Sequence, residues 1–147
     1  MIEQLVVVGG GVMGRGIAYT GAVSGFHVKL VDKYEQVLQS ARQEIEELFA
    51  GAVQRNKLTL EEAASAKERL SYHSDLEGSV QAADLVIEAV TEKLDLKKQI
   101  FEMLDRHAPA HGLLVSNTST LSLPKSVRLR GVPIKSWPCT FLTRPTK

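Results

Sequence analysis

The residues of this chain that could perform chemistry begin with three glycines, Gly9, Gly11 and Gly14. They follow an apolar run at residues 5–8 and precede a helical pattern. This is the context that a dinucleotide-binding G-x-G-x-x-G motif needs. Gly9 would permit a sharp turn, Gly11 would let the backbone approach a pyrophosphate, and Gly14 would let the helix pack on the strand. A plain glycine-rich turn is the alternative interpretation.

The helix after the glycines would begin near Val12 and Met13. Its first N–H groups and the positive end of its dipole attract phosphate, so both residues are predicted cofactor-binding positions. Asp32 ends a second strand pattern about 20 residues further on, where a carboxylate accepts hydrogen bonds from an adenosine ribose. A carboxylate there repels a 2′-phosphate, which favours NAD over NADP, although neighbouring Lys33 weakens this preference. A strand-end turn aspartate is the alternative.

The composition limits the classes of protein. A chain of 147 residues can bury one good core, so we expect one domain. A net charge of +1 gives no basic field for nucleic acid, and the apolar runs are too short to span a membrane. A core strand at the N-terminus predicts no leader peptide, and a single cysteine, Cys139, predicts no intrachain disulfide and a cytoplasmic location. Pro109 separates His107 from His111, and no metal site is predicted.

The elements that must position these residues alternate between helix and strand, which is typical of an α/β fold with a parallel, doubly wound sheet. Residues 35–56 have a helical pattern, and Thr59 and Glu62 form a capping-box pattern that begins a second helix ending near residue 70. This helical hairpin, residues 36–70, is longer than a minimal crossover. It indicates either a surface for a second ligand or partner, or a simple solvated helix pair.

Three more strands are expected in the second half of the chain, at residues 70–73, 84–90 and 112–116, with helices at 76–82 and 94–107 between them. The second of these strands has a continuous apolar run between polar ends, which predicts burial of both of its faces. Glu88, Glu92 and the polar cluster at 117–120 follow strands at the edge where α/β sheets bind ligands. A turn rich in Ser, Thr and Asn is the alternative for that cluster.

With these residues in place, the chain resembles the 3-hydroxyacyl-CoA dehydrogenases, the bacterial 3-hydroxybutyryl-CoA type most of all. The resemblance covers residues 1–123 and rests on four segments, 8–18, 30–32, 84–92 and 116–119. It implies a Rossmann-type NAD-binding domain whose helical hairpin contributes to coenzyme A binding. It also implies hydride transfer between NAD and C3 of a 3-hydroxyacyl-CoA, in fatty-acid β-oxidation or butanoate metabolism.

The resemblance also implies roles for individual residues. By matched position, Asp32 would bind the adenosine ribose, and Glu92 and Lys97 would line the cofactor site. Asn117 would lie near the nicotinamide, and Ser119 would orient the substrate oxygen, which makes Ser119 the catalytic candidate of this chain.

Partners follow from the same resemblance. An acyl-CoA is the implied substrate, and complete members of the family are expected to be homodimers. Arg55 and Lys57 on the hairpin could meet coenzyme A phosphates, an assignment that rests on their charge alone.

The chain departs from the family pattern after residue 123. The family continues to a His-Phe-Phe-Asn-Pro segment, whose histidine is the general base, and then to an all-α domain. Neither is found in this sequence, and residues 124–147 contain prolines and basic residues but no acids. We therefore expect an NAD-binding domain at 1–123, truncation of the family architecture, and an irregular tail at 124–147.

A shifted reading frame accounts for this tail. In this frame, each codon consists of the last base of one codon and the first two bases of the next. Read in this way, the codons of residues 137–144 can encode Ala-Met-His-Phe-Phe-Asn-Pro, with the histidine at the Cys139–Thr140 junction. Junctions within 123–126 likewise permit Thr-Glu-Ile, the usual continuation of the family. We expect residues 124–147 to be out of frame, and a divergent tail is the alternative.

Three functions remain open at this point. The chain is the cofactor half of a 3-hydroxyacyl-CoA dehydrogenase, a catalytically inactive NAD-binding module, or a related hydroxyacid dehydrogenase, because fold and cofactor do not fix the substrate. A missing general base lowers a rate by about 10²–10⁴.

Overall fold

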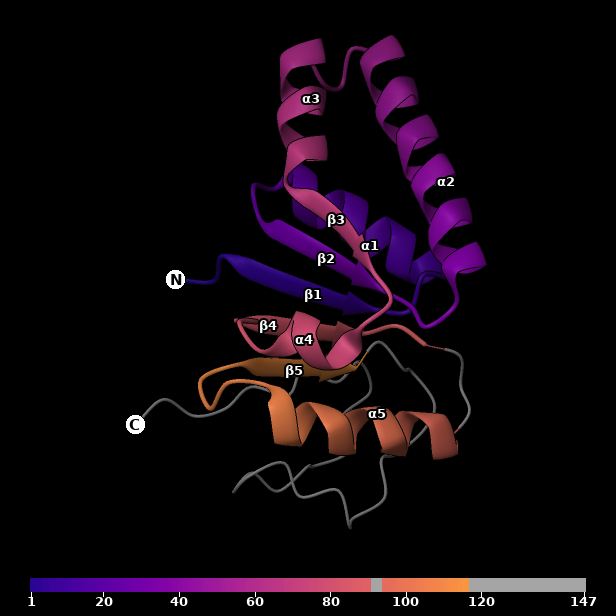
Figure 1. Ribbon diagram of the computed structural model, residues 1–147. Coiled ribbons are helices and arrows are strands. Elements are labelled where there is room, and N and C mark those ends of the chain that lie inside the picture. The colour runs from indigo at the N-terminus through magenta and orange to yellow at the C-terminus, as the bar shows by residue number, and fades with distance from the viewer. Residues whose placement is uncertain (91–93, 117–147) are drawn as a thin grey trace.

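The computed structural model describes residues 1–90 and 94–116, which form a five-stranded parallel sheet with helices on both faces (Figure 1). The strands lie in the order β3-β2-β1-β4-β5. Strands β2 and β3 are therefore added on one side of β1, and β4 and β5 on the other. This is the order of a Rossmann-type doubly wound sheet, and the predicted fold class is confirmed. The strand bounds are β1 Gln4–Val8, β2 His27–Val31, β3 Leu70–His73, β4 Leu85–Glu88 and β5 Leu113–Ser116.

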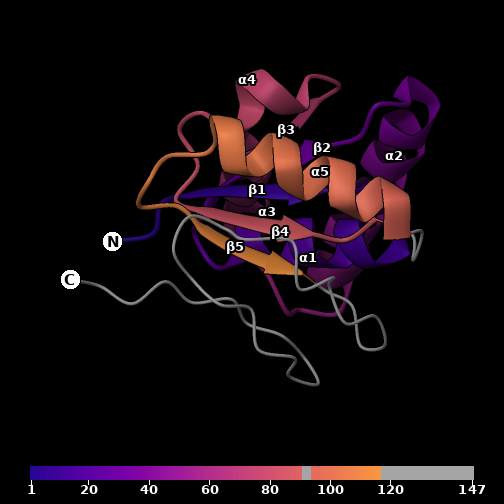
Figure 2. The same ribbon diagram turned by 90° about the horizontal axis from the view of Figure 1, so that it is seen from below.

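Alternate residues of the central strand β1 enter two separate hydrophobic cores. Leu5 and Val7 pack in the core beneath α1 and the hairpin helices α2 and α3, whereas Val6 and Val8 pack in the core beneath α4 and α5. Figure 2 shows α1 on one side of the sheet and α4 and α5 on the other. The helix bounds are α1 Val12–Val23, α2 Glu35–Gln54, α3 Leu60–Glu68, α4 Leu76–Val80 and α5 Leu94–His107.

The helical hairpin of α2 and α3 packs against α1 and extends beyond the sheet (Figure 1). Phe49 of α2 is buried and its ring lies 5.0 Å from that of Tyr19 on α1. The predicted capping box of α3 is confirmed, since Thr59 Oγ1 accepts the Glu62 N–H at 3.1 Å and Glu62 Oε2 accepts the Thr59 N–H at 2.8 Å. These two bonds satisfy N–H groups that have no partner within the helix.

Among the elements that differ from the sequence expectation are α2, α4 and β4. Helix α4 ends at Val80 rather than at residue 82. Helix α2 ends at Gln54 rather than at residue 56, because Asn56 has a φ of 55°, in the left-handed region where a helix cannot continue. Strand β4 is shorter than 84–90, and its two faces are not equally covered. Val86 is buried beneath α4 and α5, whereas Leu85 and Ile87 on the opposite face are half-buried. None of the described helices is long and apolar enough to cross a membrane.

Candidate functional site

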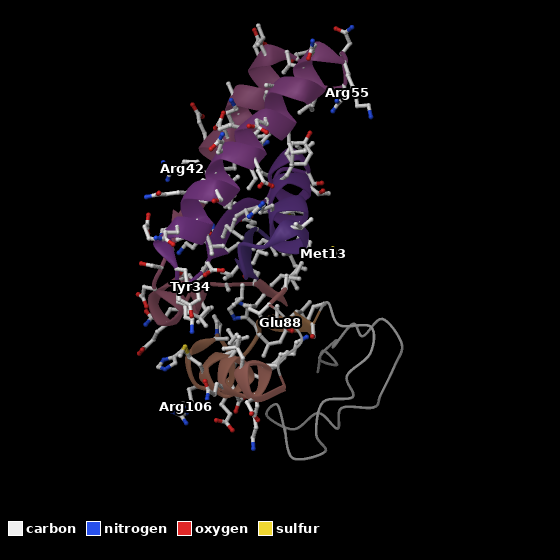
Figure 3. The ribbon with its side chains drawn as sticks, turned by 90° about the vertical axis from the view of Figure 1, so that its right-hand side faces the viewer. Met13, Tyr34, Arg42, Arg55, Glu88 and Arg106 are labelled. Carbon is white, nitrogen blue, oxygen red and sulfur yellow. The ribbon has the colours of Figure 1, made fainter. Side chains whose placement is uncertain are left out.

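The carboxyl ends of four strands meet at one edge of the sheet. Val8 of β1 lies beside Val31 of β2 and beside Glu88 of β4, and Glu88 lies beside Ser116 of β5. The glycine loop follows β1 and Asp32 follows β2, so both are brought to this edge. Figure 3 looks onto the edge, with Glu88 in its middle region. In open α/β sheets ligands bind outside this edge, at the point where the strand order reverses.

Two glycines of the motif are required by packing. Gly9 has a φ of +110°, and a Cβ atom on it would lie 2.8 Å from the carbonyl oxygen of Ala89. A Cβ atom on Gly14 would overlap the carbonyl oxygen of Gly9. Any larger residue at either position would therefore push the loop away from β4 or α1 away from the loop.

Gly11 is in a different situation. Its backbone is extended, with a φ of −71°, and no atom of residues 1–90 and 94–116 lies within 4 Å of a Cβ placed on it. Gly11 is the N-cap of α1, which has no side-chain cap and no acidic residue in its first turn. Val12 and Met13, the next two residues, are 79% and 58% exposed. The start of a 12-residue helix thus faces open space, where its N–H groups and dipole favour an anion.

Asp32 is held beside the glycine loop by backbone hydrogen bonds to both carboxylate oxygens. Its Oδ2 accepts the N–H of Gly10 at 2.9 Å, and its Oδ1 accepts the N–H of Tyr34 at 3.0 Å. A carboxylate oxygen has two lone pairs, so each oxygen keeps acceptor capacity for the hydroxyls of a ribose. Lys33 has its ammonium 4.7 Å from the centre of the Tyr34 ring.

A buried carboxylate, Glu88, forms the other half of the edge. Its Oε1 accepts the N–H of Val90 at 2.8 Å, its Oε2 accepts the hydroxyl of Ser116 at 2.6 Å, and Lys97 Nζ lies 3.6 Å from Oε2. The side chains of Glu88 and Lys97 are each 1% exposed. Their charges favour each other, because an opposite charge stabilises a buried ion.

The sequence reasoning placed Glu88 and Lys97 at this edge but missed their pairing. The sequence of α5 does contain a signal for this pairing. Lys97 stands on the same stripe of α5 as buried Phe101 and Leu104, four and seven residues later. A lysine on the buried face of a helix needs an acidic partner, and Glu88 ends an adjacent apolar strand.

Several predicted residues lie away from the edge or outside the described residues. Glu92, Asn117 and Ser119 are outside them. Arg55 and Lys57 are exposed near the turn of the hairpin, and Figure 3 shows Arg55 far from Glu88.

The histidines considered for a metal site have separate partners. His107 Nδ1 lies 3.4 Å from Glu77, and His111 Nε2 lies 3.2 Å from Asp84. Within residues 1–90 and 94–116, no three His, Cys, Asp or Glu side chains gather as metal ligands would.

Comparison with known proteins agrees with this geometry. The profile of the family described as "3-hydroxyacyl-CoA dehydrogenase, NAD binding domain" matches residues 4–128. The chain belongs to this family. Its Rossmann-type sheet is therefore that of an NAD-binding domain, and the resemblance inferred from the sequence is confirmed.

Individual members of the 3-hydroxyacyl-CoA dehydrogenase family support the same assignment. A "Probable 3-hydroxybutyryl-CoA dehydrogenase" of Bacillus subtilis is 35% identical over 132 residues, which are 90% of this chain and 46% of that protein. The mitochondrial hydroxyacyl-coenzyme A dehydrogenase of Rattus norvegicus is 36% identical over 128 residues, 84% of this chain and 41% of that protein. The crystal structure of 3-hydroxybutyryl-CoA dehydrogenase from Escherichia coli superposes with a TM-score of 0.79 at 38% identity, covering 83% of this chain and 26% of that one. The chain thus spans less than half the length of each of these relatives.

Proposed function

We propose that this chain supplies the cofactor half of an enzyme that oxidises 3-hydroxyacyl-CoA to 3-oxoacyl-CoA, or catalyses the reverse reduction. The observation that carries the proposal is the pairing of an open cradle at Gly11 with a backbone-held carboxylate at Asp32, in a chain of this family. An open cradle suits a pyrophosphate and a fixed acceptor suits a ribose, so the residues present fit NAD.

The glycine loop and the start of α1 would bind the pyrophosphate of the cofactor. Gly9 and Gly14 keep the loop closely packed, and the N–H groups of Gly11, Val12 and Met13 would bind the pyrophosphate. When bound, NAD accepts or donates the hydride.

The acidic residue after β2 would select the cofactor. Asp32 would accept the adenosine ribose hydroxyls and repel a 2′-phosphate. By matched position, Glu92 and Lys97 would line the cofactor site, Asn117 would lie near the nicotinamide, and Ser119 would orient the substrate oxygen.

An acyl-CoA is the proposed substrate. Support comes from the family and from relatives named as 3-hydroxybutyryl-CoA dehydrogenases. Arg55 and Lys57 are exposed on the hairpin, where their charges suit coenzyme A phosphates. A fatty-acid β-oxidation or butanoate role and a homodimer of the complete protein belong to the same proposal. So does a cytoplasmic location, since the sequence has one cysteine.

We also propose that residues 124–147 are read in the wrong frame, through a single-site insertion or deletion in the gene or in its sequencing. Support comes from the codon junctions around Cys139 and Thr140, which permit the His-Phe-Phe-Asn-Pro segment. Resequencing of the gene tests this. A nucleotide sequence whose shifted frame encodes the segment supports the proposal, and one that lacks those codons, or meets a stop before them, refutes it.

A second candidate, an NAD-binding module without turnover, is favoured by the absence of the family's general-base segment from the sequence. Assays of the purified 147-residue chain with NADH and acetoacetyl-CoA distinguish the two candidates. Residual turnover supports the first candidate, and NADH binding without turnover supports the second. We expect NADH binding, with turnover about 10²–10⁴ below that of a complete relative assayed in parallel, because the general base is missing. Turnover equal to that of the relative would contradict this and require another acid–base residue. Failure to bind NADH would contradict both candidates.

A further inference from the structure

Arg15, in the first turns of α1, joins the glycine loop to the helical hairpin. Its Nε donates to the carbonyl oxygen of Gly10 at 2.8 Å, and its Nη1 forms an ion pair with Glu44 of α2. The Arg15 side chain is 15% exposed, so the guanidinium lies largely inside this junction. Guanidinium donors form a rigid planar fork, which lets one side chain bind both groups in a fixed geometry.

The bond to Gly10 fixes the orientation of the peptide between Gly10 and Gly11. The described residues contain no cis peptide bond, and in a trans peptide the C=O and the following N–H point in opposite directions. Because the carbonyl oxygen of Gly10 is directed at Arg15, the N–H of Gly11 is directed away from it. The preceding peptide is fixed as well, since the N–H of Gly10 donates to Asp32.

The carbonyl oxygen of Gly11 is held by the backbone N–H of Arg15 at 3.0 Å, but its N–H has no such constraint from side-chain packing. Gly11 has no side chain, and among the described residues no atom lies within 4 Å of a Cβ position on it. Glycine is also the residue with the greatest backbone freedom. A hydrogen bond from a charged donor that is itself held by Glu44 supplies the missing constraint.

We propose that Arg15 is a positioning residue, which orients the Gly10–Gly11 peptide so that the N–H of Gly11 is presented to the cofactor pyrophosphate. The proposal rests on the cofactor site proposed above. Arg15 acts through the backbone rather than by touching the phosphates, and Glu44 holds its guanidinium in place. Neither the glycine motif nor the spacing of the acids predicts this role.

The test compares two ligands on the whole 147-residue chain. ADP-ribose contains the pyrophosphate, whereas adenosine contains only the base and ribose. Arg15→Met is expected to weaken ADP-ribose binding by about tenfold, the effect of one hydrogen bond to a charged group. Adenosine binding, followed by amide chemical shifts, should stay unchanged.

Three further variants separate positioning from charge and from folding. Arg15→Lys keeps the charge but lacks the fork, so it should bind ADP-ribose nearly as weakly as Arg15→Met. Arg42→Met removes a positive charge that stacks on Tyr72 of β3, and it should bind ADP-ribose like the wild type. Glu44→Gln, at a half-exposed position, should weaken ADP-ribose binding to a smaller extent than Arg15→Met, because Arg15 keeps its hydrogen bond to Gly10.

Each contrary result has a distinct meaning. Full recovery in Arg15→Lys would show that charge alone acts, and equal weakening of adenosine binding would show a general structural role. Wild-type affinity in both Arg15→Met and Glu44→Gln would overturn the role of Arg15 and leave the cofactor site intact. Failure of the wild-type chain to bind ADP-ribose would overturn the cofactor site itself.

Discussion

The hydroxyl of Ser116 donates a 2.6 Å hydrogen bond to Glu88 Oε2, which joins the carboxyl ends of β4 and β5 inside the protein. The same carboxylate accepts the Val90 N–H and faces the ammonium of Lys97 from α5. One buried acid therefore fixes three segments at the edge where the cofactor is proposed to bind. Its replacement should affect the stability of the whole fold.

Glu88→Gln should lower the free energy of unfolding by about 1.5–3 kcal/mol, because it removes the charge that faces the buried Lys97 ammonium and weakens the hydrogen bonds that the carboxylate accepts. Urea unfolding followed by circular dichroism measures this. The double variant Glu88→Gln with Lys97→Met is the matched control. It should lose less stability than Glu88→Gln alone, since it removes both charges. Equal unfolding midpoints for wild type and Glu88→Gln would contradict the assignment of a buried ion pair.

Gly11→Ala should leave the stability of the fold nearly unchanged, whereas Gly14→Ala should lower it. The Gly11 backbone is compatible with alanine, and the added Cβ would meet no atom of the part of the chain that the structure describes. The free energy of unfolding of the variant should therefore lie within about 0.5 kcal/mol of the wild-type value. The added methyl group would occupy space that the pyrophosphate needs. Overpacking of this kind costs about 1–3 kcal/mol, which corresponds to NADH binding about 5- to 150-fold weaker. Gly14→Ala should be unstable before any ligand is added, because its Cβ overlaps the Gly9 carbonyl oxygen.

Thermal melts and NADH fluorescence titrations on the two variants check this contrast. Unchanged NADH affinity in a folded Gly11→Ala protein would place the pyrophosphate elsewhere. A stable Gly14→Ala protein would contradict the close approach of α1 to the loop.

Acid sensitivity should arise in part at Asp84, on the amino side of the sheet. The backbone N–H groups of Gln4 and Glu3 donate to its Oδ2, each at 2.9 Å, and hold the pKa of the carboxyl below its ordinary 3.8, with a smaller contribution from His111. Because the pKa is lower in the folded state, the ionised Asp84 carboxylate stabilises the fold at pH values above its unfolded pKa of about 3.9. This contribution is lost as the pH falls through the folded pKa.

The matched variant for this prediction is Asp84→Asn, which keeps an acceptor oxygen and loses the charge. The stability difference between wild type and Asp84→Asn should be largest near neutral pH and shrink as the pH falls below 3.8. Urea titrations at a series of pH values measure it. A difference that is the same at every pH would contradict the link between the Asp84 charge and the two N–H groups.

Local patterns predicted the geometry of the glycine loop well, because that geometry depends on residues that are near one another in the sequence. Gly9, Gly11 and Asp32 could be placed from one motif and one strand end, and Thr59 from its capping box. The end of α2 was predicted two residues too late, because the pattern of apolar residues was followed to Asn56, although asparagine is among the residues that adopt the left-handed backbone that ends a helix.

Tertiary contacts were out of reach of the sequence for a different reason. Arg15 meets Glu44 across two helices, 29 residues apart in the chain, and Glu88 meets Lys97 only because β4 and α5 pack together. Pairing of this kind is decided by the packing of whole elements. The unequal burial of Leu85 and Val86 likewise depends on which helices cover each face of the sheet.

The central claim is that this edge binds NAD through Asp32, and calorimetric titration of the 147-residue chain with NADH and NADPH tests it most directly. A carboxylate facing a 2′-phosphate is a like-charge contact that costs several kcal/mol, so NADH should bind at least about tenfold more tightly than NADPH. Asp32→Asn, which loses the charge but keeps an acceptor oxygen, should narrow that gap. Equal or tighter binding of NADPH by the wild-type chain, or a gap unchanged in Asp32→Asn, would contradict the account.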